Sequence, residues 1–321
     1  MTDHPLTDPV GTGRRRLAAP GAPEAKRRRQ GRLAPYLLLS PALIIVLAIF
    51  GLPLVVMLLL SFQDWSQVGQ FTTTLQGRWT GLTNYSTLLS SGVFWSTTLR
   101  TVLVSVLMVG GSMLIGLLFA LLMRRISAWA RYLMTFALIL VWSIPALVST
   151  LVFQWMFNRQ YGIINVLLGY KNVHDWTTSE TDGWFVVILL VIWGAVPMVT
   201  IMLYAALTQV PKELVEAAHI DGANGWQTFR SVIEPIIRPV VLIMTSLSVF
   251  WDLQVFTQIF VFFSNQPQSQ FYNLGVWSYV QGWQHQNYGL ATTITALTML
   301  IMLVITIPYM RQLLRIGGDS K

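Results

Sequence analysis

The sequence contains no cysteine, which excludes disulfide bonds, thiolate metal sites and a cysteine nucleophile. Its four histidines are scattered, and no His-x-x-x-His pair of the kind that binds metal on a helix is present. A GxxxxGK[ST] phosphate-binding loop is also missing. The chain therefore has no nucleotide-hydrolysing motif of its own, and no cofactor is expected to bind to it.

Charge is scarce as well. Charged residues make up 11% of the 321 residues, whereas hydrophobic residues make up 54%, a composition that does not suit a water-soluble domain. A helix needs about 20 mostly apolar residues to cross a bilayer, and the strand alternation of a membrane barrel is missing. The sequence therefore predicts an all-α polytopic membrane protein with six transmembrane helices, at roughly 33–61, 97–123, 132–157, 184–208, 236–263 and 288–310.

The positions of the basic residues predict the orientation, because Lys and Arg in short flanking loops are retained on the cytoplasmic side. Most of them fall in four groups, at 14–32, 124–131, 212–238 and 311–321, and the other side receives Arg78, Arg100, Arg159 and Lys171. Both termini are therefore expected in the cytoplasm. Contact with anionic lipid explains the runs RRR and KRRR, so no nucleic-acid partner is expected.

The predicted organisation has three parts. Residues 1–32 are rich in Pro, Gly and Arg and are expected to form a disordered basic cytoplasmic tail. Residues 33–311 form the six-helix domain, with a cytoplasmic loop at about 209–235, and residues 312–321 form a cytoplasmic C-terminal tail. A cleaved signal peptide is disfavoured, because the apolar run from Leu33 to Phe62 is about twice the length of a signal sequence's apolar region.

A polar stretch, EAAHIDGANGWQTFRSVIEPIIRP at 216–239, interrupts the apolar runs. Pro211 can occupy the first position of a short helix, because that position needs no N–H donor. Gly222 can end the helix in the left-handed conformation, and a second short helix can follow. Two interpretations remain open on these grounds: a docking surface for another protein, or an amphipathic helix that lies on the membrane and merely connects two spans.

The same stretch resembles the EAA signature of binding-protein-dependent ABC importer permeases. Six residues match that signature in register, and the residues of DGANGWQTF, at 221–229, match the continuation typical of the carbohydrate branch. SFQDW at 61–65, GLTNYSTLL at 81–89 and YGLATTITAL at 288–297 also resemble maltose-type sugar permeases. Glu234 departs from the usual leucine, and the outer loop lacks a common Gly-Gly-Pro. The resemblance implies that these residues couple the chain to an ATPase: Glu216, Ala217, Ala218, Asp221, Gly222, Ala223, Phe229 and Pro235.

The resemblance also implies the partners and the location. It predicts a type I ABC importer permease that pairs with a second homologous permease, a dimer of ATP-binding subunits and an extracytoplasmic sugar-binding protein. The ATPase would bind ATP and Mg²⁺, and this chain would be no enzyme. A prokaryotic plasma membrane is the expected location, and a mono- or oligosaccharide is the expected cargo.

Asp252 is the one carboxylate predicted to lie deep in a span, where an ionisable residue is a candidate functional site. Aromatic and amide side chains surround it in the sequence, and they suit the C–H faces and hydroxyl groups of a sugar. The candidate substrate path therefore comprises Trp251, Asp252, Gln254, Phe256 and Gln258, with Asp252 and Phe256 expected on one helical face. The alternative is that Asp252 bonds to a neighbouring span and that the aromatic residues only pack.

Tryptophan and proline residues mark further positions. Trp142, Pro145, Trp193 and Pro197 are expected to break or bend the third and fourth spans. A bent helix can line a cavity or act as a gate, although such residues more often only shape the bundle. Five other tryptophans lie near outer span ends, where an interfacial aromatic belt explains them; they are Trp65, Trp79, Trp95, Trp176 and Trp184.

Three alternative functions are weighed against the sugar importer. An ion-coupled secondary transporter normally needs buried ionisable residues for its driving ion, and a single aspartate gives little support for that class of transporter. A polytopic membrane enzyme needs a catalytic cluster, and no Glu/Asp/His grouping of that type appears. An importer of a phosphorylated polyol or another small polar solute is the alternative within the ABC importers.

Overall fold

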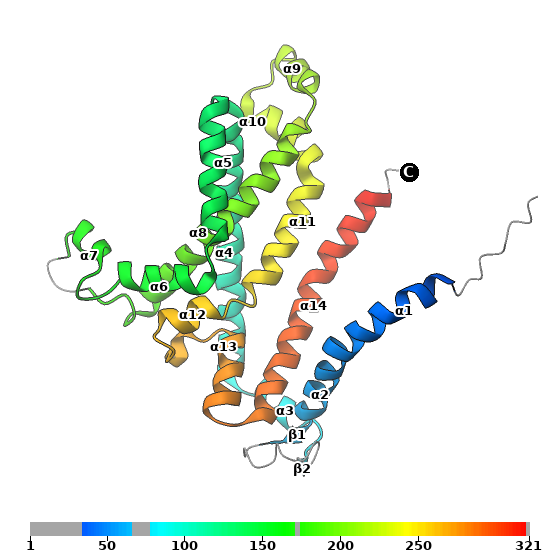
Figure 1. The fold of residues 1–321 in the computed structure, drawn as a ribbon, viewed down its shortest axis with the longest axis vertical. Coiled ribbons are helices and arrows are strands. Elements are labelled where there is room, and N and C mark those ends of the chain that lie inside the picture. Colours follow the sequence, from blue (N-terminus) through cyan, green and yellow to red (C-terminus); the bar gives the residue numbers. More distant parts are fainter. Residues whose placement is uncertain (1–33, 66–77, 171–173, 319–321) are drawn as a thin grey trace, which may run out of the picture. The chain divides into compact units, whose positions relative to one another are not determined.

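The structure is a computed structural model that describes residues 34–65, 78–170 and 174–318 (Figure 1). The predicted tail at 1–32 lies outside the described residues. The chain divides into two compact units, Met1–Leu52 and Pro53–Lys321. In the first unit, α1 (Ala34–Val46) continues into a π-helical turn, η1 (Leu47–Gly51). The helix α2 (Leu52–Ser61) follows, and Leu37–Ser61 is apolar and long enough to cross a membrane.

Long helices form the bundle of the second unit. They are α4 (Gly92–Arg125), α8 (Glu180–Thr208), α11 (Glu234–Asp252) and α14 (Tyr288–Gly318). Helix α8 packs along α4, and α11 contacts α4, α8 and α14 (Figure 1). In the described residues, five helical segments could cross a membrane, and a bent pair raises the number to six. The predicted all-α fold with six spans is confirmed.

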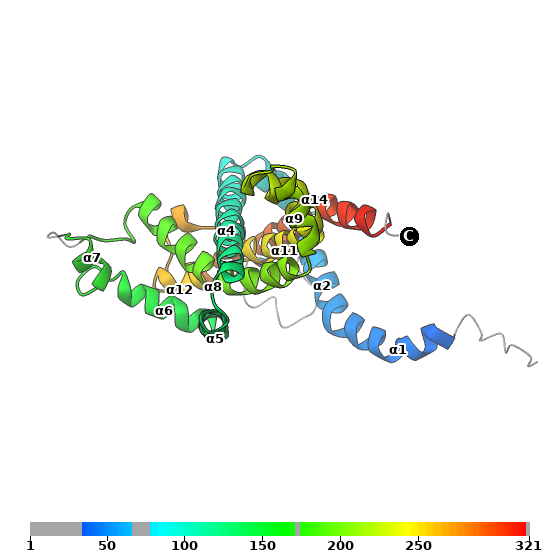
Figure 2. The same ribbon diagram turned by 90° about the horizontal axis from the view of Figure 1, so that it is seen from above.

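The bent pair consists of α5 (Ala128–Ser143) and α6 (Ala146–Met156), which meet at 96°. Pro145 lies at the break, where a proline removes a backbone donor and disfavours helix in the residue before it. Figure 2 shows α6 running sideways from the bundle towards α7 (Ile163–Leu167). The predicted bend in the third span is thus confirmed at Pro145.

Gly116 in α4 allows a close contact between two helices of the core. A Cβ atom on Gly116 would stand 2.5 Å from Val199 Cγ1 and 3.3 Å from the backbone nitrogen of Thr200, both in α8. The two backbones can therefore approach closely only because Gly116 has no side chain. Ala120, Val199 and Leu203 continue this contact as part of a buried apolar cluster.

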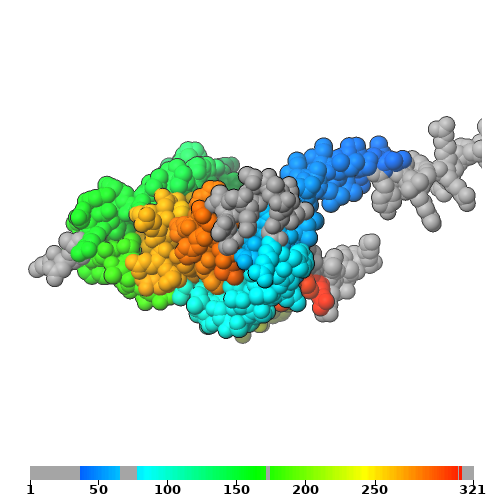
Figure 3. Space-filling view, turned by 90° about the horizontal axis from the view of Figure 1, so that it is seen from below, coloured from blue at the N-terminus to red at the C-terminus, as the bar shows by residue number. Residues whose placement is uncertain are grey.

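The end of the bundle opposite the loop after α8 is built from short elements. Strands β1 (Gln63–Asp64) and β2 (Arg78–Trp79) pair antiparallel, and α3 (Thr83–Leu89) precedes α4. After α11 come α12 (Thr257–Phe262), η4 (Ser269–Phe271), α13 (Leu274–Tyr279) and η5 (Val280–Gln284). Figure 3 shows this end, with the cyan segment around α3 beside the orange segment around α13. Leu88, Phe94, Leu274 and Trp277 join these segments in one buried cluster.

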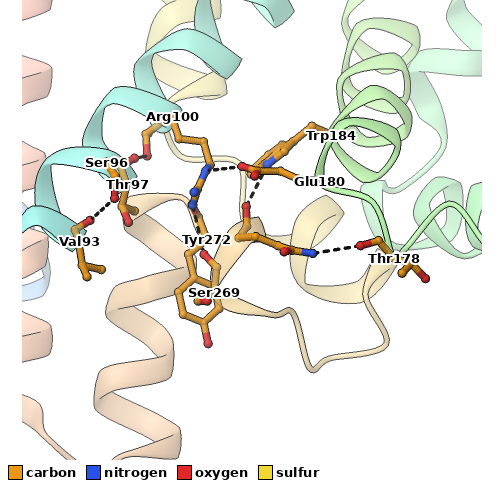
Figure 4. A network of polar contacts seen from close by, with 11 residues as sticks. Val93, Ser96, Thr97, Arg100, Thr178, Glu180, Trp184, Ser269 and Tyr272 are labelled. Atoms are coloured by element: carbon orange, nitrogen blue, oxygen red, sulfur yellow. Dashed lines mark hydrogen bonds and ion pairs between the residues drawn. The ribbon is translucent and has the colours of Figure 1, made fainter.

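Polar contacts hold the segment 264–273 to α4 and α8 at the same end (Figure 4). Arg100 Nε lies 3.2 Å from a carboxylate oxygen of Glu180, and Arg100 Nη1 donates to the carbonyl oxygens of Ser269 and Tyr272 at 3.1 and 3.3 Å. Trp184 Nε1 donates to the carbonyl oxygen of Gln270 at 3.2 Å. This one arginine therefore ties three separate parts of the chain together.

The tryptophans predicted to form an interfacial belt do not form one group. Trp79 and Trp95 are 61% and 56% exposed, as a belt requires. Trp65, Trp176 and Trp184 are only 2%, 5% and 7% exposed, so for these three the prediction is wrong. They pack inside the protein, where their large apolar rings bury more surface than an interface would allow.

Candidate functional site

Two regions contain the residues singled out in the sequence: the loop after α8 and a cavity at the end of α11. The loop begins with α9 (Lys212–Ile220), which Pro211 precedes as its N-cap residue. The expected start at Pro211 is therefore off by one position. The amide of Gly222 donates to the carbonyl of His219 at 3.1 Å, and that of Ala223 donates to the carbonyl of Ala218 at 2.9 Å.

These two hydrogen bonds form a Schellman motif, which ends a helix with a residue in the left-handed region. Gly222 has φ of +83°, so the predicted left-handed turn is confirmed. No atom lies within 4 Å of the place where a Cβ on Gly222 would stand. Glycine is therefore required here by the backbone conformation and not by lack of space.

The second half of the loop contains α10 (Gly225–Thr228) and a π-helical turn, η3 (Phe229–Ile233), before α11. Asn224 and Gln227 form a capping box, in which each side chain accepts the other's backbone N–H at 2.9 and 2.8 Å. Pro235 is the second residue after the π turn, in the first turn of α11. Its ring would clash with the carbonyl of Ser231 in a regular helix, and a widened turn relieves that clash.

The loop presents an apolar surface at its tip. Ile220 is 87% exposed, Trp226 is 69% exposed, and Trp226 stacks on Phe229 at 5.9 Å between ring centroids. Of the eight residues predicted to couple, Ala218, Ala223 and Phe229 are half-buried, and these are exposed: Glu216, Ala217, Asp221, Gly222 and Pro235. Exposed large apolar side chains beside carboxylates are typical of an interaction surface.

Helix α11 ends at Asp252, eleven residues before the end of the span predicted at 236–263. The chain then leaves the helical path, and α12 begins at Thr257. Asp252 and Phe256 therefore do not share one helical face, and that prediction is wrong. Asn273 fixes the break, because its side-chain amide donates to the carbonyl of Val255 at 2.5 Å and its Oδ1 accepts the N–H of Val276 at 2.8 Å.

A cavity of about 340 Å³ opens at this break. It lies between the α5–α6 bend, the middle of α8 and the end of α11. All five residues predicted for the substrate path line it, namely Trp251, Asp252, Gln254, Phe256 and Gln258. The structure thus brings them together by ending the helix, and not by the helical periodicity expected from the sequence.

Asp252 is the charged residue of this cavity. It is 6% exposed, and its Oδ2 has no hydrogen-bond partner. Its backbone carbonyl accepts a hydrogen bond from Ser105 Oγ in α4 at 3.2 Å. Oδ2 of this carboxyl group therefore makes no hydrogen bond to a neighbouring span.

Sequence reasoning missed part of the cavity lining. Trp142 and Trp193, marked in the sequence only as residues of bent spans that could line a cavity, do line it, and Ser149 and Ser248, which the sequence did not single out, line it as well. The role of Arg100 in joining α4, α8 and the segment 264–273 also had no signal in the sequence. Partners separated by more than 80 residues, such as Arg100 and Ser269, cannot be found from local patterns.

The segment before α8 contains a carboxyl group with a perturbed pKa. Burial raises the pKa of Asp175, but hydrogen bonds from the hydroxyl and N–H of Thr177, together with Thr178 and the charge of Arg159, outweigh that effect. The pKa therefore lies below its usual value. Among the described residues, no group of three His, Asp or Glu side chains could hold a metal ion.

The bundle of spans, the loop after α8 with its Schellman turn and the cavity at the end of α11 are features of the membrane subunit of a transporter. Residues 112–315 match the family described as binding-protein-dependent transport system inner membrane component, and the chain belongs to that family. It is thus a permease subunit of an ABC-type importer and not an enzyme.

Relatives cover nearly the whole chain. The diacetylchitobiose uptake system permease protein DasB of Streptomyces coelicolor is 37% identical, over 100% of this chain and 99% of that protein. The trehalose/maltose transport system permease protein MalF of Thermococcus litoralis is 28% identical, over 88% and 94%. A crystal structure of a bacterial ABC transporter that imports alginate has a TM-score of 0.75 at 20% identity, over 88% of this chain and 95% of that one. This last likeness shows that the fold is shared.

Proposed function

We propose that this chain is the transmembrane subunit of an ATP-driven importer of mono- or oligosaccharides. The observation that carries the proposal is the cavity at the end of α11, where aromatic rings, amides and one carboxylate converge. Sugars offer apolar C–H faces to aromatic rings and hydroxyl groups to amides and carboxylates. The relatives named above, whose names specify diacetylchitobiose and trehalose or maltose, support a sugar over a phosphorylated polyol.

The cavity would form this chain's part of the translocation path. Trp251 is half exposed and Gln254 and Gln258 lie on the same lining, so a sugar in the cavity can meet a ring face and side-chain amides together. Ser149 and Ser248 add hydroxyl groups. A second homologous permease would complete the path, and an extracytoplasmic binding protein would deliver the sugar.

The loop after α8 would transmit the motion of the ATPase. Gly222 holds α9 against the start of α10, and the exposed Ile220 and Trp226 give this surface apolar side chains for a cleft in the ATP-binding subunit. Glu216 contributes an exposed carboxylate on the same helix. ATP and Mg²⁺ would bind to the ATPase dimer, and its closure would move α9 and, through η3, the N-terminal end of α11.

The proposed orientation places this loop and both termini in the cytoplasm of a prokaryotic cell, with the chain in the plasma membrane. The basic residues on the loop side support it, because Arg124, Arg125 and Arg131 lie at the same end as α9. The opposite end, with β1, β2 and the segment 264–273, would face the binding protein.

The test is uptake by proteoliposomes that contain this chain, its second permease, the ATPase and the binding protein. Uptake of diacetylchitobiose or maltose should require hydrolysable ATP and should be insensitive to ionophores. Asp252→Leu should reduce that uptake while the complex still purifies intact.

Three results would count against the proposal. Uptake driven by an ion gradient without ATP would indicate a secondary transporter. Uptake of a phosphorylated polyol in place of any sugar would change the cargo. Full uptake by Asp252→Leu would remove Asp252 from the substrate path and leave it with a packing role.

A further inference from the structure

We infer that α6 (Ala146–Met156) lies in the plane of the membrane, with its exposed face buried in the hydrocarbon of one leaflet. The third span then consists of α5 alone. The leaflet is the one at the end of the bundle opposite the loop after α8, which is the extracytoplasmic leaflet in the proposed orientation. The partner of this surface is membrane lipid, and the inference holds whatever cargo the importer carries.

The first argument is the distribution of side chains around α6. Every exposed residue of this helix is apolar. The large ones, each about half exposed, are Leu147, Val148, Leu151, Val152 and Trp155. The opposite face is buried and contains Ser149 and Thr150 together with Phe153. A helix at a water surface turns its polar residues outward, so the pattern of α6 is the reverse of that and fits a helix that faces lipid.

The second argument is that the polar donors on the inner face of α6 have partners within the protein. Ser149 Oγ and Thr150 Oγ1 donate to the carbonyl of Ala146 at 2.9 and 2.6 Å. Gln154 Nε2 donates to Ser264 Oγ at 2.9 Å. In lipid, where no water is present to bond to them, polar groups must be paired inside the protein. These side chains therefore need no water.

The third argument is the length and direction of the helices. α5 has 16 residues and is therefore about 24 Å long, while the hydrocarbon core of a bilayer is about 30 Å thick. It starts beside Arg124, Arg125 and Arg131, which belong at the headgroups. The end of α5 thus lies near the opposite boundary of the hydrocarbon, and α6 turns away there by 96°. A helix at that angle to a span runs nearly parallel to the membrane.

The fourth argument is that the exposed face of α6 continues a surface that already faces lipid. Phe136, Ile139 and Leu140 in α5, a span, are 60%, 50% and 51% exposed. α12 contacts α6 on the side away from α9 (Figure 1). The free side of α6 therefore faces back along α5, towards the middle of the bilayer, and the two helices present one apolar corner to the lipid.

Charge and aromatic residues mark where this surface ends. The sequence has no charged residue between Arg131 and Arg159. Trp155 and Tyr161, on either side of Arg159, are 57% and 59% exposed. Tryptophan and tyrosine are enriched at the boundary between hydrocarbon and headgroups. The end of α6 therefore has the composition of a helix at that boundary.

The experiment uses single-cysteine variants, which this cysteine-free chain allows without further changes. The assembled complex carries a nitroxide spin label at Val148→Cys or Val152→Cys and is reconstituted in nanodiscs. Collisions of the label with oxygen, which concentrates in lipid, are compared with collisions with a water-soluble nickel chelate. The ratio should be at least fivefold higher at both positions than at Thr181→Cys, an exposed site between Glu180 and Asp182.

A matched pair of labels in α5 tests the direction of α6. Four residues advance about 6 Å along a helix axis. The depths at Phe136→Cys and Leu140→Cys, in a span, should therefore differ by about 5–6 Å. The depths at Val148→Cys and Val152→Cys should agree to within about 2 Å, because their four-residue step runs along the membrane plane. If either label in α6 prevents assembly, Leu147→Cys and Leu151→Cys supply an equivalent pair.

Three results would overturn the inference. Frequent collisions with the nickel chelate at both α6 positions would show that this face meets water. Immobile labels that neither reagent reaches would show that a protein, such as the second permease, covers it. A depth difference in α6 as large as that in α5 would show that α6 continues the third span across the membrane. None of these results bears on the proposed cargo, which uptake tests separately.

Discussion

Replacing Gly222 with valine perturbs the turn between α9 and α10 without touching any span. Gly222 has φ of +83°, and a Cβ at this position would meet nothing within 4 Å. The penalty therefore comes from the backbone alone. A β-branched residue held in this region costs about 1–3 kcal/mol, which corresponds to a roughly 5–150-fold loss of the turn's population relative to any relaxed conformation.

The expected result is a permease that inserts normally but couples poorly. With Gly222→Val, we expect ATPase co-purification, or sugar-stimulated ATP hydrolysis in reconstituted membranes, to fall at least fivefold. Gly222→Asn is the matched control, because asparagine tolerates the left-handed region, and it should keep most of the coupling. Glu216→Lys should also weaken coupling, because it reverses the charge of an exposed side chain on α9.

The opposite result would refute the reasoning. Full co-purification and full stimulation in both Gly222→Val and Glu216→Lys would show that the ATPase does not depend on this surface. The loop would then be an amphipathic connection at the membrane surface, for which neither substitution should matter beyond local stability.

Three further predictions concern the bundle and its far end. Gly116→Ala should lower the thermal stability of the purified complex, because overpacking costs about 1–3 kcal/mol, whereas Gly110→Ala, in the same helix with open space around it, should not. Asn273→Ala should also lower that stability by about 1–3 kcal/mol, because it leaves the carbonyl of Val255 without its donor; unchanged stability would contradict the role of this residue in the break after α11. The pKa of Asp175 is lower in the folded chain than its usual value, so the hydrogen bonds of its ionised carboxylate stabilise the segment before α8. This stabilisation is fully present above a pH of about 4 and is lost as the pH falls below that value. The protection of amides in that segment, measured against their intrinsic exchange rate at each pH, should therefore fall in acid in the native chain but not in Asp175→Asn.

The loop after α8 could be predicted well from the sequence, because its structure depends on neighbours within a few residues. Pro211 marks the start of α9 to within one position, and Gly222 adopts the left-handed conformation that its place after a helix predicts. The break at Pro145 is local only in part. A proline lacks its N–H wherever it stands, but α8 continues as one helix through Pro197, so a proline alone does not predict a break as sharp as the one at Pro145.

The candidate substrate path was predicted in its members but not in its geometry. The five residues between Trp251 and Gln258 do gather at one cavity. The sequence favoured a continuous helix to residue 263, because nothing in an apolar run shows where a distant side chain will bond. The side-chain amide of Asn273, 18 positions after Val255, donates a hydrogen bond to the backbone carbonyl of Val255 and stabilises the break.

The sequence by itself determined the class of protein, the number of spans and the turn at Gly222, since hydrophobic length and backbone preference act residue by residue. Only the tertiary structure decided which tryptophans are buried, which partners Arg100 takes and which residues enclose Asp252. Trp65 and Trp95 have similar surroundings in the sequence, yet one is 2% and the other 56% exposed. Burial depends on what the rest of the chain brings against a side chain, and that is set by the packing of segments far apart in the sequence.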